Sequence, residues 1–180
     1  MKRLIRDFFN HTVTGLPLSE KSKCNSIRFD FIGADLMVVK ETAHTIINEA
    51  IDSDKFWICL YGVEAFDDLL KLNLFSDYED EVVINLEKTF ADEVWYDADS
   101  NSIFCALASR TDFNVWRFIE YSLLNNSLSL VLFLVDITTG TCINFYDRRG
   151  MLVLSKCLNV VEGLQNKHST FVCKYIRCDE

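Results

Sequence analysis

The chain has 180 residues, a net charge of −9 and a hydrophobic content of 49%. This length and apolar content exclude an intrinsically disordered chain and favour one globular domain spanning residues 1–180. The acidic balance argues against a protein that binds nucleic acid, because the phosphate backbone would repel it.

No segment of the sequence predicts a contact with a membrane. The longest apolar stretch, residues 128–135, is far shorter than the roughly 20 residues that a membrane-spanning helix needs. Near the N-terminus, Arg6 and Asp7 interrupt the apolar region that a signal peptide requires. We therefore expect a cytoplasmic protein.

The first third of the chain alternates between helical and extended patterns. Apolar residues at helical spacing predict helices at 2–13 and 39–51. Between them, residues 26–33 alternate apolar and polar side chains, as a strand with one solvated face does. Residues 55–62 are apolar on both faces, which predicts a central strand covered on each side.

The rest of the chain predicts mainly strands. Its expected strands are 82–86, 93–97, 102–109, 128–137, 142–146, 151–155 and 170–177, and its expected helices are 63–75, 109–126 and 156–166. The helix at 109–126 is expected to start at a Ser109 cap and to bury Val115, Trp116, Ile119, Leu123 and Leu124. Hairpins and crossover helices together predict an α+β (mixed α/β) fold, with helices packed on a central, largely antiparallel sheet.

Cysteines and histidines offer the only nucleophile–base pairs worth considering. The seven cysteines are spread along the chain and are odd in number, which predicts reduced thiols in the core rather than a disulfide scaffold or a metal site. Cys59 and Cys105, with His44 or His168, are the pairs that a fold could bring together. No nucleophile elbow, phosphate loop or dinucleotide fingerprint accompanies them. The sequence therefore predicts neither an enzyme nor a cofactor.

Residues 75–99 carry almost all of the excess negative charge. Between residues 77 and 99, nine carboxylates face one lysine, Lys88, which gives a local net charge of −8 against −9 for the whole chain. Large aromatic side chains lie among these acids: Tyr78, Phe90, Trp95 and Tyr96. A solvated surface that keeps the protein soluble would explain the acids. It would not explain the aromatics, which are the residues that anchor protein interfaces.

We therefore predict that this stretch binds a partner protein. A dense negative field accelerates the capture of a cationic partner, and carboxylates with interleaved aromatics mimic the phosphates and bases that a nuclease expects. The predicted partner-binding residues are Asp77, Tyr78, Glu79, Asp80, Glu81, Glu93, Trp95, Tyr96, Asp97 and Asp99.

Two short motifs resemble a bacterial family of small domains of unknown function. The first is an Arg-Phe-acid strand, here Arg28, Phe29 and Asp30, and the second is a late Tyr-Asp-x-Arg-Gly turn at residues 146–150. The resemblance covers roughly residues 25–160. Arg148 stands where the family pattern more often has an acid, so the role of that turn does not carry over directly.

In size, acidity and lack of a catalytic signature, the chain also resembles the immunity proteins of bacterial contact-dependent inhibition systems. This resemblance implies a cytoplasmic antitoxin that occludes the basic active site of a cognate toxin domain, often a nuclease, without turnover. Two alternatives stay open. One is a small enzyme or ligand-binding domain with a cleft near Arg28, Tyr146 and Arg149, and the other is a homodimer that buries the same aromatics.

Overall fold

The computed structural model describes residues 25–61, 95–96, 102–111, 113–124, 131–147 and 150–173. Within these residues, seven strands form one sheet in the order β1-β7-β6-β5-β2-β4-β3, and every neighbouring pair is antiparallel. The strands are β1 (Asn25–Asp30), β2 (Lys55–Tyr61), β3 (Trp95–Tyr96), β4 (Ser102–Ser109), β5 (Val131–Asp136), β6 (Thr141–Asp147) and β7 (Gly150–Ser155). The prediction of a central antiparallel sheet is confirmed.

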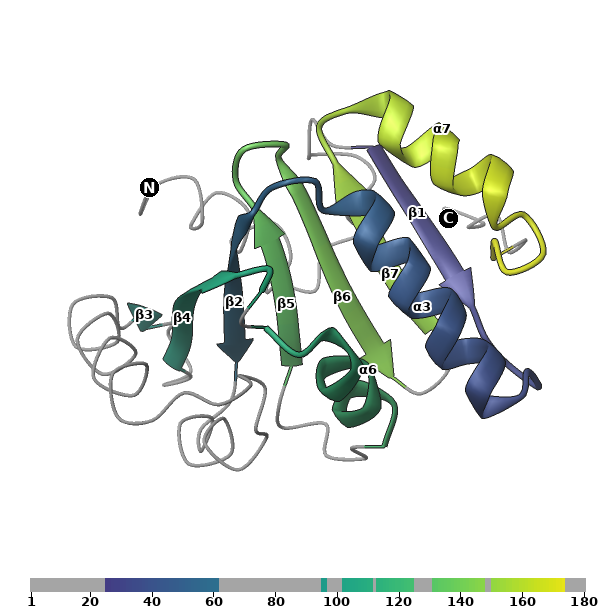
Figure 1. Ribbon diagram of the computed structural model, residues 1–180, viewed down its shortest axis with the longest axis horizontal. Coiled ribbons are helices and arrows are strands. Elements are labelled where there is room, and N and C mark those ends of the chain that lie inside the picture. The colour runs from purple at the N-terminus through teal and green to yellow at the C-terminus, as the bar shows by residue number, and fades with distance from the viewer. Residues whose placement is uncertain are drawn as a thin grey trace.

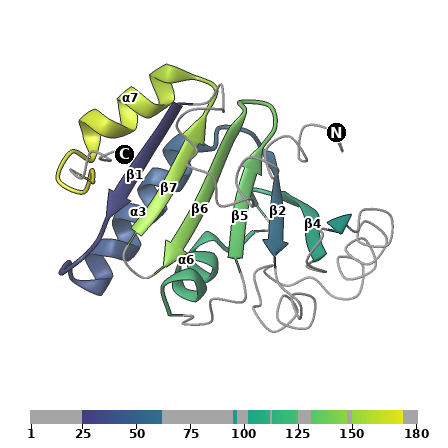
Figure 2. The same ribbon diagram turned by 180° about the vertical axis from the view of Figure 1, so that it is seen from behind.

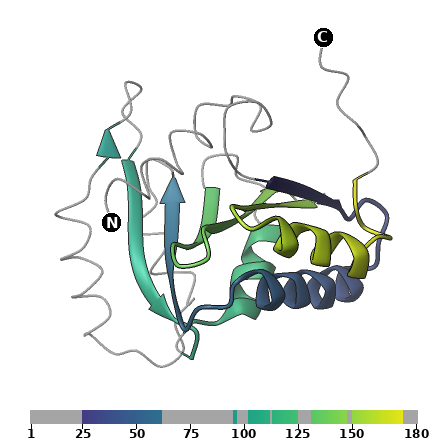
Figure 3. The same ribbon diagram turned by 90° about the horizontal axis from the view of Figure 1, so that it is seen from above.

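The described helices all pack on one face of this sheet (Figures 1 and 3). They are α3 (Leu36–Ala50), α6 (Val115–Leu124) and α7 (Leu158–Lys167), and α3 contacts both of the others. Their apolar sides meet the sheet in one core, whose fully buried side chains include Phe29, Ile46, Phe118 and Met151. The described chain is therefore a single α+β domain, as predicted.

The opposite face of the sheet, turned towards the viewer in Figure 2, also carries buried side chains on its middle strands. Trp57, Phe133, Val135, Cys142 and Leu154 are at most 7% exposed, yet they do not belong to the core beneath the helices. They alternate along their strands with residues that do belong to it, such as Ile58 and Leu134. Strands β2, β5 and β6 are thus covered on both faces, which confirms the central strand predicted at 55–62.

The start of α6 differs from the prediction. The helix begins at Val115, and the side chain of Asn114 caps it by accepting a hydrogen bond from the backbone N–H of Arg117 at 3.0 Å. Ser109 instead ends β4, and its carbonyl accepts from the N–H of Phe113 at 3.1 Å. Trp116, predicted to face inward, is 44% exposed, while Phe118 fills the core.

Most other predicted elements of the described chain are found, within two or three residues. The strands predicted at 93–97 and 102–109 pair as a hairpin, with Trp95 opposite Ile103. The last predicted strand, 170–177, is described only to Cys173, and in that part it is reduced to one antiparallel bridge between Val172 and Phe29. The elements predicted at 2–13, 63–75 and 82–86 lie outside the described residues.

One end of the sheet is tied together by the carboxylate of Asp136, which is fully buried. It accepts hydrogen bonds from the hydroxyl and the N–H of Ser53, at 2.8 and 3.2 Å, and from the N–H groups of Thr138 and Thr139, at 2.9 and 3.2 Å. These four donors link the α3–β2 connection to the β5–β6 turn. Because both oxygens are occupied by donors from the fold, we assign Asp136 a structural role.

We expect the Asp136→Asn variant to lower the free energy of unfolding by about 1–3 kcal/mol, because an amide N–H₂ would face buried N–H donors. Asp136→Ala should cost more, since it leaves four donors without their acceptor. Urea unfolding measures both changes, and Asp52→Asn, an exposed acid in the same connection, is the matched control. Equal stability of the Asp136 and Asp52 variants would contradict the structural role.

Candidate functional site

The acidic stretch is anchored at one end of the sheet, beside its centre. Strand β2 ends at Tyr61 and β4 begins at Ser102, and the register pairs Tyr61 with Ile103. The chain therefore leaves and rejoins the sheet at neighbouring points, and residues 75–99 belong to the connection between them. This connection also supplies β3, which pairs with β4 and is the outermost described strand on that side.

Only two of the predicted partner-binding residues fall in the described part of the chain. Trp95 and Tyr96 form the backbone of β3. The other eight lie outside the described residues: Asp77, Tyr78, Glu79, Asp80, Glu81, Glu93, Asp97 and Asp99.

The two family-like motifs meet at the same end of the sheet, where β1, β2 and β6 all finish (Figure 1). Asp30, at the end of β1, pairs with Gly150, and Gly150 pairs with Asp147. Arg28 and Tyr146 lie on β1 and β6, two strands apart across β7, which corresponds to roughly 10 Å between the strands. Arg149 lies outside the described residues. The fold thus brings the two motifs together although more than 100 residues separate them.

A cluster of exposed apolar side chains also occupies this end, where the chain passes from β1 into α3. Ile32 is 69% exposed, Met37 59%, Leu36 48% and Val38 45%. We call these four residues the apolar patch. Several large apolar side chains exposed within one short segment are a feature that docking sites for other proteins often have.

The backbone beneath the apolar patch is fixed by its own hydrogen bonds. A carboxylate oxygen of Asp30 accepts from the N–H of Ile32 at 3.1 Å, and that of Asp35 caps α3 by accepting from Met37 at 2.9 Å and Val38 at 3.4 Å. Gly33, with φ +77°, adopts the left-handed conformation that this turn requires. The patch is therefore presented on an ordered surface, which lowers the entropy cost of binding.

The sequence did contain a signal for this patch. Residues 36–39 are four consecutive apolar side chains, and successive helical positions are about 100° apart, so they cannot all face one side. Val39 points into the core, and the other three are left outside. The sequence alone does not tell which of them are exposed.

The two histidines considered as bases are engaged in contacts between helices. The ring of His44 stacks on Trp116 with centroids 4.3 Å apart, and Asn48 lies within hydrogen-bonding distance of it at 3.2 Å. Burial lowers the pKa of His44 below its usual value. His168 contacts Glu49 at 3.2 Å. Cys59 and Cys105, in turn, are register partners on β2 and β4.

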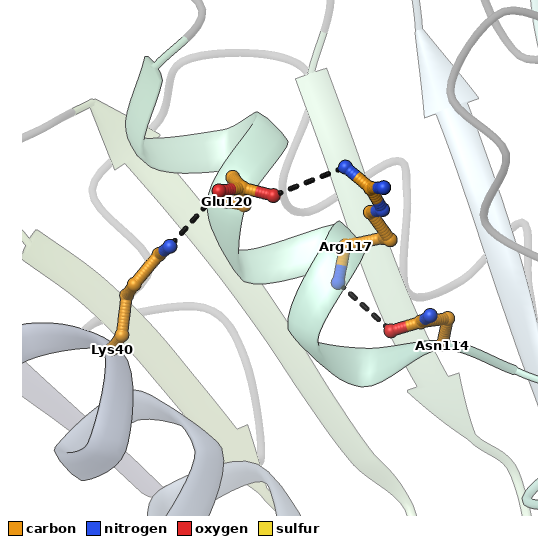
Figure 4. A network of polar contacts seen from close by, with 4 residues as sticks. All are labelled: Lys40, Asn114, Arg117 and Glu120. Carbon is orange, nitrogen blue, oxygen red and sulfur yellow. Dashed lines mark hydrogen bonds and ion pairs between the residues drawn. The ribbon is translucent and has the colours of Figure 1, made fainter. Parts of the chain in front are cut away.

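Charged residues beside these histidines fix the helices against one another. The carboxylate of Glu120 on α6 forms ion pairs with Lys40 of α3, at 2.9 Å, and with Arg117 of its own helix, at 3.3 Å (Figure 4). The hydrogen bond from Lys40, more than any other interaction, holds the pKa of Glu120 below its usual value. Burial alone would raise the pKa of Glu49, but hydrogen bonds from Lys167 and His168 outweigh it and lower that pKa. These acids are therefore charged at neutral pH and serve packing.

In the described part of the chain, no group of three or more His, Cys, Asp or Glu side chains is arranged to hold a metal ion. Among the same residues, no helix has the length and apolar character to cross a membrane.

These observations define the class of protein: an α+β domain with an ordered apolar patch and an acidic connection, both anchored where β1 and β2 end. The chain belongs to the family described as Domain of unknown function (DUF3885), whose model matches residues 5–176. This match establishes membership of a family of unknown function, the coarser of the two resemblances drawn from the sequence. The chain matches no curated protein and no solved structure.

Proposed function

We propose that this protein is a cytoplasmic immunity protein, which binds a cognate bacterial toxin domain and neutralises it by covering its basic active site. A cationic nuclease is the expected target. The observation that carries the proposal combines charge with exposed apolar groups: nearly all of the net negative charge belongs, in the sequence, to the β2–β4 connection, and the strand ends that bound this connection finish at the same end of the sheet as the apolar patch, with β7, β6 and β5 between β1 and β2.

The two features have complementary physical roles in binding. The acids attract a cationic partner over a distance and raise the association rate. The apolar patch, with the aromatics of residues 75–99, would supply the contacts that exclude water and slow dissociation. A specific complex buries roughly 800 Å² on each partner, more than four side chains provide, so the two surfaces would have to act together.

The proposed mechanism requires no catalytic group and no cofactor from this chain. An inhibitor that occupies an active site works by affinity alone, so its surface has to match the partner rather than a transition state. The described ionisable side chains fit that role, since Glu49, Glu120 and Asp136 are held by partners within the fold.

A second candidate is a small enzyme or ligand-binding domain with its site between the two family-like motifs. The register that brings Arg28 near the β6–β7 turn favours it. A small anionic ligand that competes with the toxin domain would support this alternative. Self-association that buries the aromatics of residues 75–99 is the third candidate, and a dimeric mass by light scattering would support it.

The first prediction concerns the acids. Binding to the C-terminal toxin domain encoded next to this protein should be tight, in the nanomolar range, and should weaken as salt rises, because salt screens the attraction. Replacing Asp77, Glu79, Asp80 and Glu81 by Asn or Gln should reduce the association rate by about tenfold or more and flatten its salt dependence. Stopped-flow association at two salt concentrations measures both effects.

The control for the acids removes charge at the other end of the sheet. Asp52→Asn and Asp54→Asn neutralise two exposed acids there, Glu162→Gln neutralises a third in the middle of α7, and the triple variant should keep the association rate within about twofold, because screening weakens distant charges. Normal binding by the variant at 77–81 would remove the acidic stretch from the proposal. Absence of any binding or protection from toxicity by the unaltered protein would refute the immunity function itself.

The second prediction concerns the apolar patch. The double variant Ile32→Ser and Met37→Ser should raise Kd by about tenfold to a hundredfold, mainly through faster dissociation, while the thermal unfolding midpoint stays nearly unchanged because both side chains are exposed. Leu158→Ser is the matched control, since Leu158 is 50% exposed at the start of α7, at the far end of the sheet. Equal affinities of the two variants would exclude the patch from the interface.

A further inference from the structure

Strands β2 and β4 place two cysteines directly opposite each other. Their antiparallel register pairs Cys59 with Cys105. Among the strand pairs that the structure describes, this is the only position where one cysteine faces another. Facing cysteines are not sufficient for a disulfide, because antiparallel ladders contain two kinds of pair with different spacing.

One backbone hydrogen bond determines which kind of pair this is. The N–H of Arg110 donates to the carbonyl of Asp54 at 2.8 Å, and these two residues continue the β2–β4 register one step beyond Lys55 and Ser109. In an antiparallel ladder, hydrogen-bonded and non-hydrogen-bonded pairs alternate. Counting from this hydrogen-bonded pair, Cys59 and Cys105 occupy a non-hydrogen-bonded position.

That position has the geometry that a disulfide needs. Cα atoms of a non-hydrogen-bonded pair lie about 4.5 Å apart and their side chains are at their closest, whereas hydrogen-bonded pairs are about 5.5 Å apart. Disulfides bridge Cα separations of roughly 4.4–6.8 Å and require Cβ atoms at close range. We propose that Cys59 and Cys105 are a redox-active pair that closes into a reversible cross-strand disulfide.

The described neighbours of the pair differ in exposure. Leu107, two residues beyond Cys105 on β4 and so on the same face, is 51% exposed. On the other side, Trp57 and Phe133, which flank Cys59 along β2 and across β5, are at most 7% exposed. The described neighbours of the pair on this face are therefore exposed on β4 and buried on β2 and β5.

The chemistry is thiol–disulfide exchange with a small-molecule disulfide such as oxidised glutathione. The thiolate of one cysteine attacks a glutathione sulfur, forms a mixed disulfide and releases one glutathione thiolate. The thiolate of the second cysteine then attacks the protein sulfur of that mixed disulfide and releases the second glutathione. The protein loses two thiol protons and two electrons, and the disulfide bond of oxidised glutathione accepts both, which yields two molecules of reduced glutathione.

Closure of this disulfide would act on the acidic connection. The bond would join residues 59 and 105, so residues 75–99 would lie within a covalent loop. A cross-link that closes a long loop restricts the unfolded chain and stabilises the folded one. The inference rests on the register of β2 and β4 alone and is independent of the immunity function.

Oxidation of the purified full chain with a series of oxidised glutathione concentrations tests the proposal. After an acid quench and blocking with N-ethylmaleimide, thiol counting should show the loss of two thiols, and a non-reduced digest should contain peptides linked through Cys59 and Cys105. The thermal unfolding midpoint should rise on oxidation and return on reduction. Cys59→Ser and Cys105→Ser should each abolish the paired loss, while Cys142→Ser, which removes a buried thiol elsewhere in the sheet, should leave it unchanged.

Three results would overturn the proposal, and the unaltered protein alone can give each of them. They are a glutathione adduct that persists on Cys59 or Cys105 without closure, linkage of either residue to a different cysteine, and full retention of both thiols at oxidant concentrations that modify the exposed Cys157. Because this readout needs no partner protein, its failure is distinct from a failure of toxin binding.

Discussion

Strand β2 is the element on which the rest of the described structure depends. It pairs with β5 on one side and β4 on the other, and Trp57 and Ile58 show that it is buried on both faces. A strand in that position must be followed by a chain that leaves the sheet and returns beside it, because β4 takes the neighbouring place. The β2–β4 connection, which carries nearly all of the net negative charge in the sequence, therefore starts and ends at adjacent points of the sheet.

The sequence predicted the elements whose apolar pattern has one clear period. Alternation gave β1, a continuous apolar run gave β2, and helical spacing gave α3 and α7. It failed where local signals compete: Ser109 and Asp112 resemble a helix cap as well as Asn114 does, and only the end of β4 decides between them. Trp116 was predicted to be buried because it is apolar, but its large ring is used on the surface, where it stacks on His44.

Some features of the candidate site could likewise be predicted from the sequence, and others could not. Charge is a property of composition, so the acidic stretch is visible in the sequence, and its anchoring at the sheet end follows from the pairing of Tyr61 with Ile103. The position of the apolar patch depends on which side of α3 faces the core. The pairing of Cys59 with Cys105 depends on the register between two strands that are distant in sequence. The sequence did not predict the structural role of Asp136, because an acid at the end of a strand is typical of a turn. Only the structure shows the four donors that bind its carboxylate.

The two ends of the sheet differ in how their polar and apolar groups are satisfied, and that difference bears on the proposed function. At the Asp136 end, the carboxylate is buried and hydrogen-bonded, the hydroxyls of Thr141 and Ser155 hydrogen-bond each other, and Ser155 also accepts from the backbone. The polar groups at that end therefore stabilise the fold. At the other end, an ordered turn holds apolar side chains out to solvent, and the connection that carries the acidic stretch leaves and rejoins the sheet there. Ordering exposed apolar groups gains little for folding, since they bury no surface. Burying these apolar groups against another protein would provide the free energy that folding does not. We therefore assign the proposed binding role to this end.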